Sequence, residues 1–209
     1  MRDVIDLPTD PKKLRVRLRR YERQMREEKR EHGSIGDGSG NRYLLGPLYM
    51  LLGDLDGALR SFDWFDEEFP DDSLMPDQCL CWALAHLRNR DEPRARFKLR
   101  AAMLGNLFLI PSFLGAPIEE LDIWHSSNLA DPSYLEWVPA AYFTIWSATE
   151  RQWADDTYQD AELVEVRTRY IDIYRELKTL APGPRRTRIV QEASALRHPR
   201  KEGLNLRSV

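Results

Sequence analysis

The chain of 209 residues has little cysteine and no long uninterrupted apolar run. Its two cysteines, Cys79 and Cys81, are too few and too close together to staple a disulfide scaffold, so we expect a reducing, cytoplasmic compartment. The longest uncharged apolar stretch, residues 101–118, is broken by prolines and glycines, which argues against a transmembrane helix. Residues 1–6 lack the apolar core of a secretory signal, so we expect none.

The motifs of several common catalytic sites are also missing. The sequence has no Gly-x-Ser-x-Gly elbow, no His-Glu-x-x-His pair and no dinucleotide fingerprint. The glycine-rich residues 33–40 lack a preceding strand and a Gly-Lys-Ser/Thr ending, which favours a flexible connector over a phosphate loop. On a helix, Cys79 and His86 would share one face, but Cys81 would point away from Cys79. We therefore favour core packing of the two cysteines over a metal site. No catalytic residue, metal or cofactor is predicted.

Charge is distributed unevenly along the sequence. Residues 1–32 carry 11 basic and 7 acidic side chains, and residues 183–209 carry 7 basic and 2 acidic ones. Residues 33–182 hold 13 basic and 25 acidic side chains, a net charge of −12. The basic ends could bind an anionic partner such as nucleic acid or lipid, but the simpler interpretation is that they fold against, or fray from, an acidic body.

The pattern of apolar residues predicts an all-α protein without strands. Asp10 and Pro11 are typical of a helix start, and Leu14, Leu18, Tyr21 and Met25 then recur at helical spacing. We therefore expect a helix over residues 11–31 that docks along one narrow apolar seam.

Residues 42–70 contain the most specific pattern in the chain. The positions that carry it are Leu45, Gly46, Tyr49, Gly53, Leu55, Ala58, Phe62, Phe65 and Pro70. They indicate two helices joined at Gly53, with Ala58 and Phe62 facing back onto the first helix. This spacing resembles the tetratricopeptide repeat, with Arg42 and Phe65 as departures from the usual early Trp and second Ala.

A second and weaker hairpin is expected over residues 76–104, where Ala95, Leu99 and Ala102 match Ala58, Phe62 and Phe65. The resemblance implies right-handed helical hairpins that bind peptides or proteins on a concave face. On this chain that face contains Tyr43, Met50, Leu51, Leu80, Leu84 and Leu87. Because these side chains are apolar, we expect the chain's own helices, or else a partner, to cover them.

The C-terminal half departs from the repeat pattern. We expect capping helices within residues 117–180, including a short one over 116–124 and a strong one over 160–180. Residues 1–182 would form a single all-helical domain. Residues 183–209 follow a Pro-Gly-Pro break and are basic and short of aromatics, so we expect a flexible, disordered tail with at most a transient helix over 187–197.

Two functions remain open from the sequence. The first is a non-catalytic interaction module or adaptor with a protein or peptide partner. The second is an enzyme or metal-dependent protein that uses Glu119, Asp122 and His125, because an acid and a histidine three residues apart meet on one helix face. In the alternative interpretation of the same residues, His125 ends the helix and bonds its last carbonyls.

Overall fold

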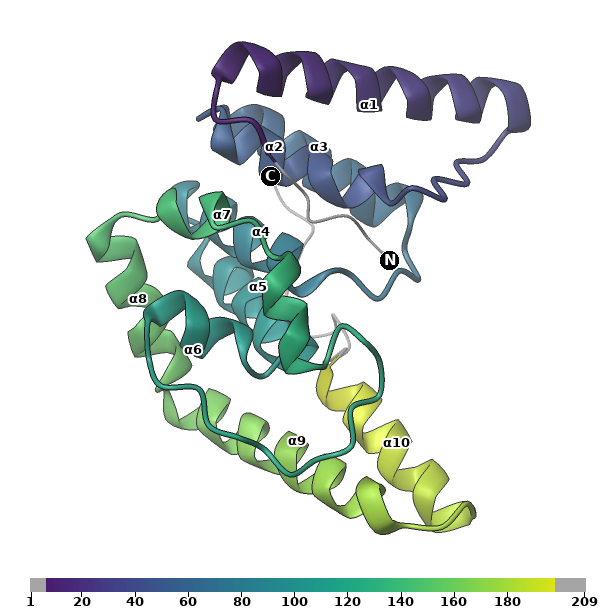
Figure 1. The fold of residues 1–209 in the computed structure, drawn as a ribbon, viewed down its shortest axis with the longest axis vertical. Coiled ribbons are helices and arrows are strands. Elements are labelled where there is room, and N and C mark those ends of the chain that lie inside the picture. Colours follow the sequence, from purple (N-terminus) through teal and green to yellow (C-terminus); the bar gives the residue numbers. More distant parts are fainter. Residues whose placement is uncertain (1–6, 198–209) are drawn as a thin grey trace.

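The computed structural model describes residues 7–197, and within that range every regular element is a helix and no strand is present. None of the helices in residues 7–197 has both the length and the apolar character needed to cross a bilayer. Figure 1 shows the N-terminal helix α1 along one edge of the molecule, with α2 and α3 beside it, and α9 and α10 at the opposite end.

Helix α1 occupies Pro11–His32, where the sequence predicts a helix over residues 11–31. The Asp10 side chain caps its first turn by accepting a hydrogen bond from the Lys12 backbone N–H at 2.8 Å. Gly33 ends the helix at φ 73°, a left-handed conformation in which glycine has no steric penalty. The apolar stripe is buried and forms one small core with Leu45 and Leu48 of α2, so α1 docks along a single seam.

Two helical hairpins follow α1. A 3-10 turn, η1 (Asn41–Leu44), leads into α2 (Leu45–Leu51) and α3 (Leu55–Glu68), which meet at Gly53 with φ 71°. Helices α4 (Pro76–Arg88) and α5 (Glu92–Gly105) form the second pair. Asp54 and Asp91 cap α3 and α5 by accepting backbone hydrogen bonds.

Helix α4 is the centre of the core. Every residue from Pro76 to His86 is buried, so α4 is surrounded on all sides. It packs against α5, α2 and α3, and the rings of Phe62 and Trp82 stack with centroids 4.7 Å apart. A helix that is buried all round presents no concave face of its own to solvent.

The C-terminal half consists mostly of short helices. It contains α6 (Leu109–Leu114), the 3-10 helix η2 (Pro132–Trp137), α7 (Ala141–Thr144), α8 (Ala148–Tyr158) and α9 (Ala161–Thr179). The short helix expected over residues 116–124 is wrong, because residues 116–126 have no regular structure. Pro117 and the 3.0 Å hydrogen bond from Trp124 N–H to the Tyr174 carbonyl instead favour an extended strap across α9 (Figure 1).

The expected flexible tail is wrong for residues 184–197, which form α10 (Pro184–Arg197). Its buried pair, Ile189 and Ala193, lies four residues apart on the face that packs toward α9. Arg186 donates hydrogen bonds of 2.7 Å to the carbonyls of Leu177 and Leu180, and so holds the start of α10 against the end of α9. Residues 198–209, the rest of the predicted tail, lie outside the described range.

Candidate binding groove

The residues predicted to form a concave binding face lie inside the protein instead. Met50, Leu80 and Leu84 are at most 2% exposed, which excludes them from contact with a partner in this fold. Tyr43, Leu51 and Leu87 are half-buried and pack against the same core. The surface is therefore covered by the chain itself, which is the first of the two coverings expected from the sequence.

Several elements provide this cover. Helix α1 lies over α2, and η2 meets α4 through a 2.5 Å hydrogen bond that the buried Tyr134 hydroxyl donates to the Asp77 carboxylate. At the entrance to the first hairpin, the Tyr43 hydroxyl donates to Asp72, and the Arg42 guanidinium bonds the same carboxylate at 3.0 Å. These polar contacts fix the covering elements in place, so the predicted face is structural.

The polar cluster predicted around His125 does not form a joint site. Asp122 is exposed and makes an ion pair with Lys178 of α9. His125 uses Nδ1 in a 3.0 Å contact with the Ala130 carbonyl, while Glu119 is exposed on the strap. Because residues 119–125 are not helical, the three-residue spacing of Asp122 and His125 does not bring their side chains together. Across residues 7–197, no three His, Cys, Asp or Glu side chains are grouped so that they could hold a metal ion.

Cys79, Cys81 and His86 are all buried in the core, and both cysteines are free thiols. Burial raises the pKa of the Cys79 thiol to about 12 and lowers the pKa of His86 to about 4. Burial also raises the pKa of the Cys81 thiol, so all three side chains are neutral at physiological pH. The prediction that both cysteines pack in the core is confirmed.

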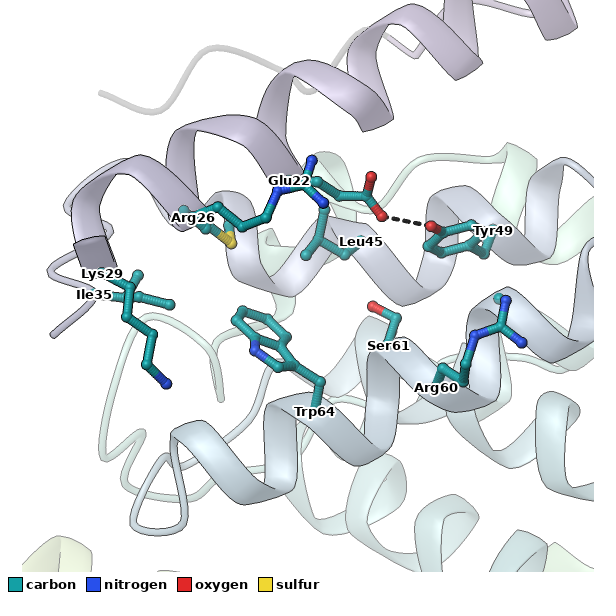
Figure 2. Close-up of a pocket in the computed structure, with 11 residues that line it drawn as sticks. Glu22, Arg26, Lys29, Ile35, Leu45, Tyr49, Arg60, Ser61 and Trp64 are labelled. Atoms are coloured by element: carbon teal, nitrogen blue, oxygen red, sulfur yellow. Dashed lines mark hydrogen bonds between the residues drawn. The ribbon is translucent and has the colours of Figure 1, made fainter. Parts of the chain in front are cut away.

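An open groove of about 300 Å³ lies between α1, α2 and α3, at the C-terminal half of α1. Figure 2 shows Trp64 projecting from α3 toward α1, with Glu22 and Arg26 opposite it. Leu45 and Tyr49 of α2, Met25 of α1 and Ile35 supply the other apolar walls. The volume is at the lower end of the range for small-molecule pockets, ~300–1,000 Å³, and suits one or two large side chains.

The charged residues at the mouth of the groove are not all paired. The Tyr49 hydroxyl donates to Glu22, and burial together with that carboxylate raises the pKa of Tyr49 to about 12. Lys29 pairs with Glu68 of α3 and ties the end of α1 to the hairpin. Among residues 7–197, Arg26 and Arg60 make no ion pair with a carboxylate, and both are exposed. Glu22 keeps its negative charge, because the Tyr49 hydroxyl that it accepts from is neutral, so the mouth carries two arginines and one carboxylate over an apolar floor.

Of the residues that line this groove, Tyr49 and Trp64 are the two that stand out in the sequence. Tyr49 belongs to the hairpin pattern, and Trp64 falls between the core positions Phe62 and Phe65, where it is half-buried at the edge of the core. A single aromatic residue at such a position is too common on protein surfaces to indicate a partner surface from the sequence alone. Arg26 and Arg60 give no signal, because each is one of many basic residues in the sequence.

Comparisons with known proteins give no match: the chain matches no family model, no curated protein and no solved structure. The resemblance to tetratricopeptide repeats therefore rests on the residue pattern alone.

Proposed function

We propose that the chain is a non-catalytic protein-interaction module, built on tetratricopeptide-like hairpins, that binds its partner in the groove between α1, α2 and α3. The observation that carries this proposal is the combination of an aromatic floor at Trp64 with the exposed Arg26 and Arg60 at the mouth. Two free cysteines agree with a cytoplasmic setting.

The partner we propose is a segment of another protein that inserts one apolar side chain and carries acidic residues on both sides of it. An apolar side chain that inserts between these walls would lose its contact with water, and the few residues that dominate interface affinity are usually found in such positions. Lys29 is neutralised by Glu68, and the two arginines outnumber the single carboxylate of Glu22, so the net charge at the mouth is positive. Arg26 from α1 and Arg60 from α3 flank the groove on separate helices and can each meet one acidic side chain (Figure 2).

Fluorescence anisotropy with labelled synthetic peptides tests the proposal. The panel holds 15-residue peptides with a central Leu, Phe or Trp between aspartates and glutamates, the same peptides with lysines, and the same peptides with serine at the centre. We expect measurable binding by the acidic apolar peptides only. Arg26→Glu combined with Arg60→Glu should weaken it at least tenfold, since two exposed ion pairs of ~0.2–1 kcal/mol each become repulsive.

The matched control is Arg188→Glu on α10, an exposed arginine at the other end of the molecule, which should leave peptide affinity unchanged. Trp64→Ala should weaken binding about thirtyfold, the effect of removing an anchor worth ~2 kcal/mol, with helix content checked by circular dichroism. The proposal is refuted if no acidic apolar peptide binds at submillimolar concentration, or if the lysine peptides bind equally well. It is also refuted if Arg188→Glu matches the effect of the double reversal.

A further inference from the structure

The outward face of α1 carries a basic row that the groove does not use. We call this row the α1 ridge; it consists of Lys12, Lys13, Arg19, Arg20 and Arg23, with Val16 among them. Between Pro11 and Tyr21 the helix has no acidic residue, and all members of the ridge are exposed. The buried stripe lies on the opposite side of the same helix, so the ridge faces away from the body of the protein.

The positive charge of the ridge is almost unneutralised within the protein. Among residues 7–197, Lys12, Lys13, Arg19 and Arg20 have no carboxylate partner, and Arg23 has only a 3.9 Å contact with the exposed Glu27. A shallow groove of about 360 Å³ runs along this part of α1 and is lined by Pro8, Lys12, Lys13, Val16, Arg17 and Arg20. The surface is thus ready to accept an anion along its length.

The chemistry of the ridge distinguishes between classes of anionic partner. A membrane-surface helix buries its apolar face in the lipid, but the apolar face of α1 is already packed against α2. A protein interface needs a buried anchor, and Val16, 69% exposed, is the only apolar side chain of the ridge. The ridge has no aromatic residue on which unpaired bases could stack. Long cationic side chains without anchors are suited to contacts with phosphate groups.

The geometry agrees with a phosphate row. From Lys12 to Arg23 the helix advances about 16 Å at ~1.5 Å per residue. One strand of a duplex presents about five phosphates over that length, at ~3.4 Å each along the axis. We infer that the α1 ridge binds double-stranded nucleic acid through its phosphate backbone, without reading base sequence. The net charge of −12 over residues 33–182 limits the interaction to this edge of the molecule.

Anisotropy with a labelled 20-base-pair DNA duplex of arbitrary sequence, and with an RNA duplex of the same sequence, tests this inference on the full chain. At ~3 phosphate contacts the logarithm of the affinity should fall against the logarithm of salt concentration with a slope of about −2.7, or about fortyfold between 50 and 200 mM salt. Two duplexes of different sequence should bind equally. The ridge variant changes three residues to alanine: Lys12, Arg19 and Arg20. The control variant changes three exposed arginines of α9 and α10: Arg175, Arg185 and Arg188.

We expect the ridge variant to bind the duplex at least tenfold more weakly at 50 mM salt, with a salt slope that is shallower by about one for each phosphate-binding side chain removed. The affinity of the control variant should fall much less. The inference is overturned if neither duplex binds at 50 mM salt, if the control variant is weakened as much as the ridge variant, or if vesicles with 30% phosphatidylserine bind more tightly than the duplexes. The ridge variant should still bind the acidic peptides, because Arg26, Arg60 and Trp64 are unchanged, so the two proposals can fail separately.

Discussion

Replacing Gly46 by alanine tests how closely α2 approaches α3. A β-carbon at this position would lie 2.2 Å from Cε1 of Phe62, far inside van der Waals distance. Phe62 is 1% exposed and stacks on Trp82, with the ring planes 8° apart. The ring therefore cannot withdraw unless α4 moves with it. The added methyl group would disturb the packing of α2, α3 and α4 together.

The expected size of the effect follows from two opposing contributions. Overpacking of a core costs ~1–3 kcal/mol, and more when the neighbour cannot move. The higher helix propensity of alanine returns at most ~1 kcal/mol. We therefore expect Gly46→Ala to lower the free energy of unfolding by about 1–2 kcal/mol, or the melting temperature by roughly 2–8 °C for a chain of this size. Urea unfolding followed by far-ultraviolet circular dichroism measures it, with the m-value unchanged.

Two further variants separate this clash from a general effect of alanine. Gly38→Ala, where an added β-carbon meets no atom within 4 Å, should change stability by less than ~0.5 kcal/mol. Phe62→Leu removes the part of the ring that is struck, so it should cost less in the Gly46→Ala background than in the wild type, with a coupling energy of ~0.5–3 kcal/mol. A Gly46→Ala protein as stable as the wild type, or an additive double variant, would refute the packing described.

Three other outcomes are expected. Tyr134→Phe removes the buried hydrogen bond to Asp77 and should lower stability by ~1.5–3 kcal/mol in urea unfolding. Burial lowers the pKa of His86 from 6.5 to about 4, so below pH 6.5 its imidazole stays neutral in the native state but takes up a proton in the unfolded state. The contribution of the neutral His86 to the free energy of unfolding is therefore fully present above pH 6.5 and is lost as the pH falls toward 4. Over that range the wild type should lose more stability than His86→Leu, and equal losses would contradict the assignment. Ile189→Ala should cost ~2 kcal/mol and speed proteolysis within residues 184–197, whereas a disordered segment would show neither effect.

The elements that sequence reasoning places correctly are those with a complete local signal. The helix over residues 11–31 has a cap, a stripe of four apolar residues and a terminating glycine, and each is a feature of a few neighbouring residues. The same holds for the break at Gly53 and the start of α9 after Asp160. In these places local preference and tertiary packing agree, so the sequence suffices.

The errors come from contacts between distant residues. Residues 116–124 have an adequate apolar pattern for a helix, but Trp124 bonds the backbone of Tyr174, 50 positions later, and the strap stays extended. The composition of residues 184–197 indicates a tail, and it carries no sign of the contacts that Ile189 and Arg186 make with α9. Predicted sites fail in the same way, because the roles of Asp122 and Leu84 are set by their neighbours in space.

The position of the groove follows from the narrowness of the α1 stripe. Four buried side chains at helical spacing give a seam that seals Leu45 and Leu48 of α2. It is too narrow to cover α3 as well, so Trp64 and Arg60 stay on the open side of the seam, opposite Arg26. Helix α1 therefore builds one wall of the observed groove. The hairpin pattern alone could not locate this groove, because α1 supplies one of its walls.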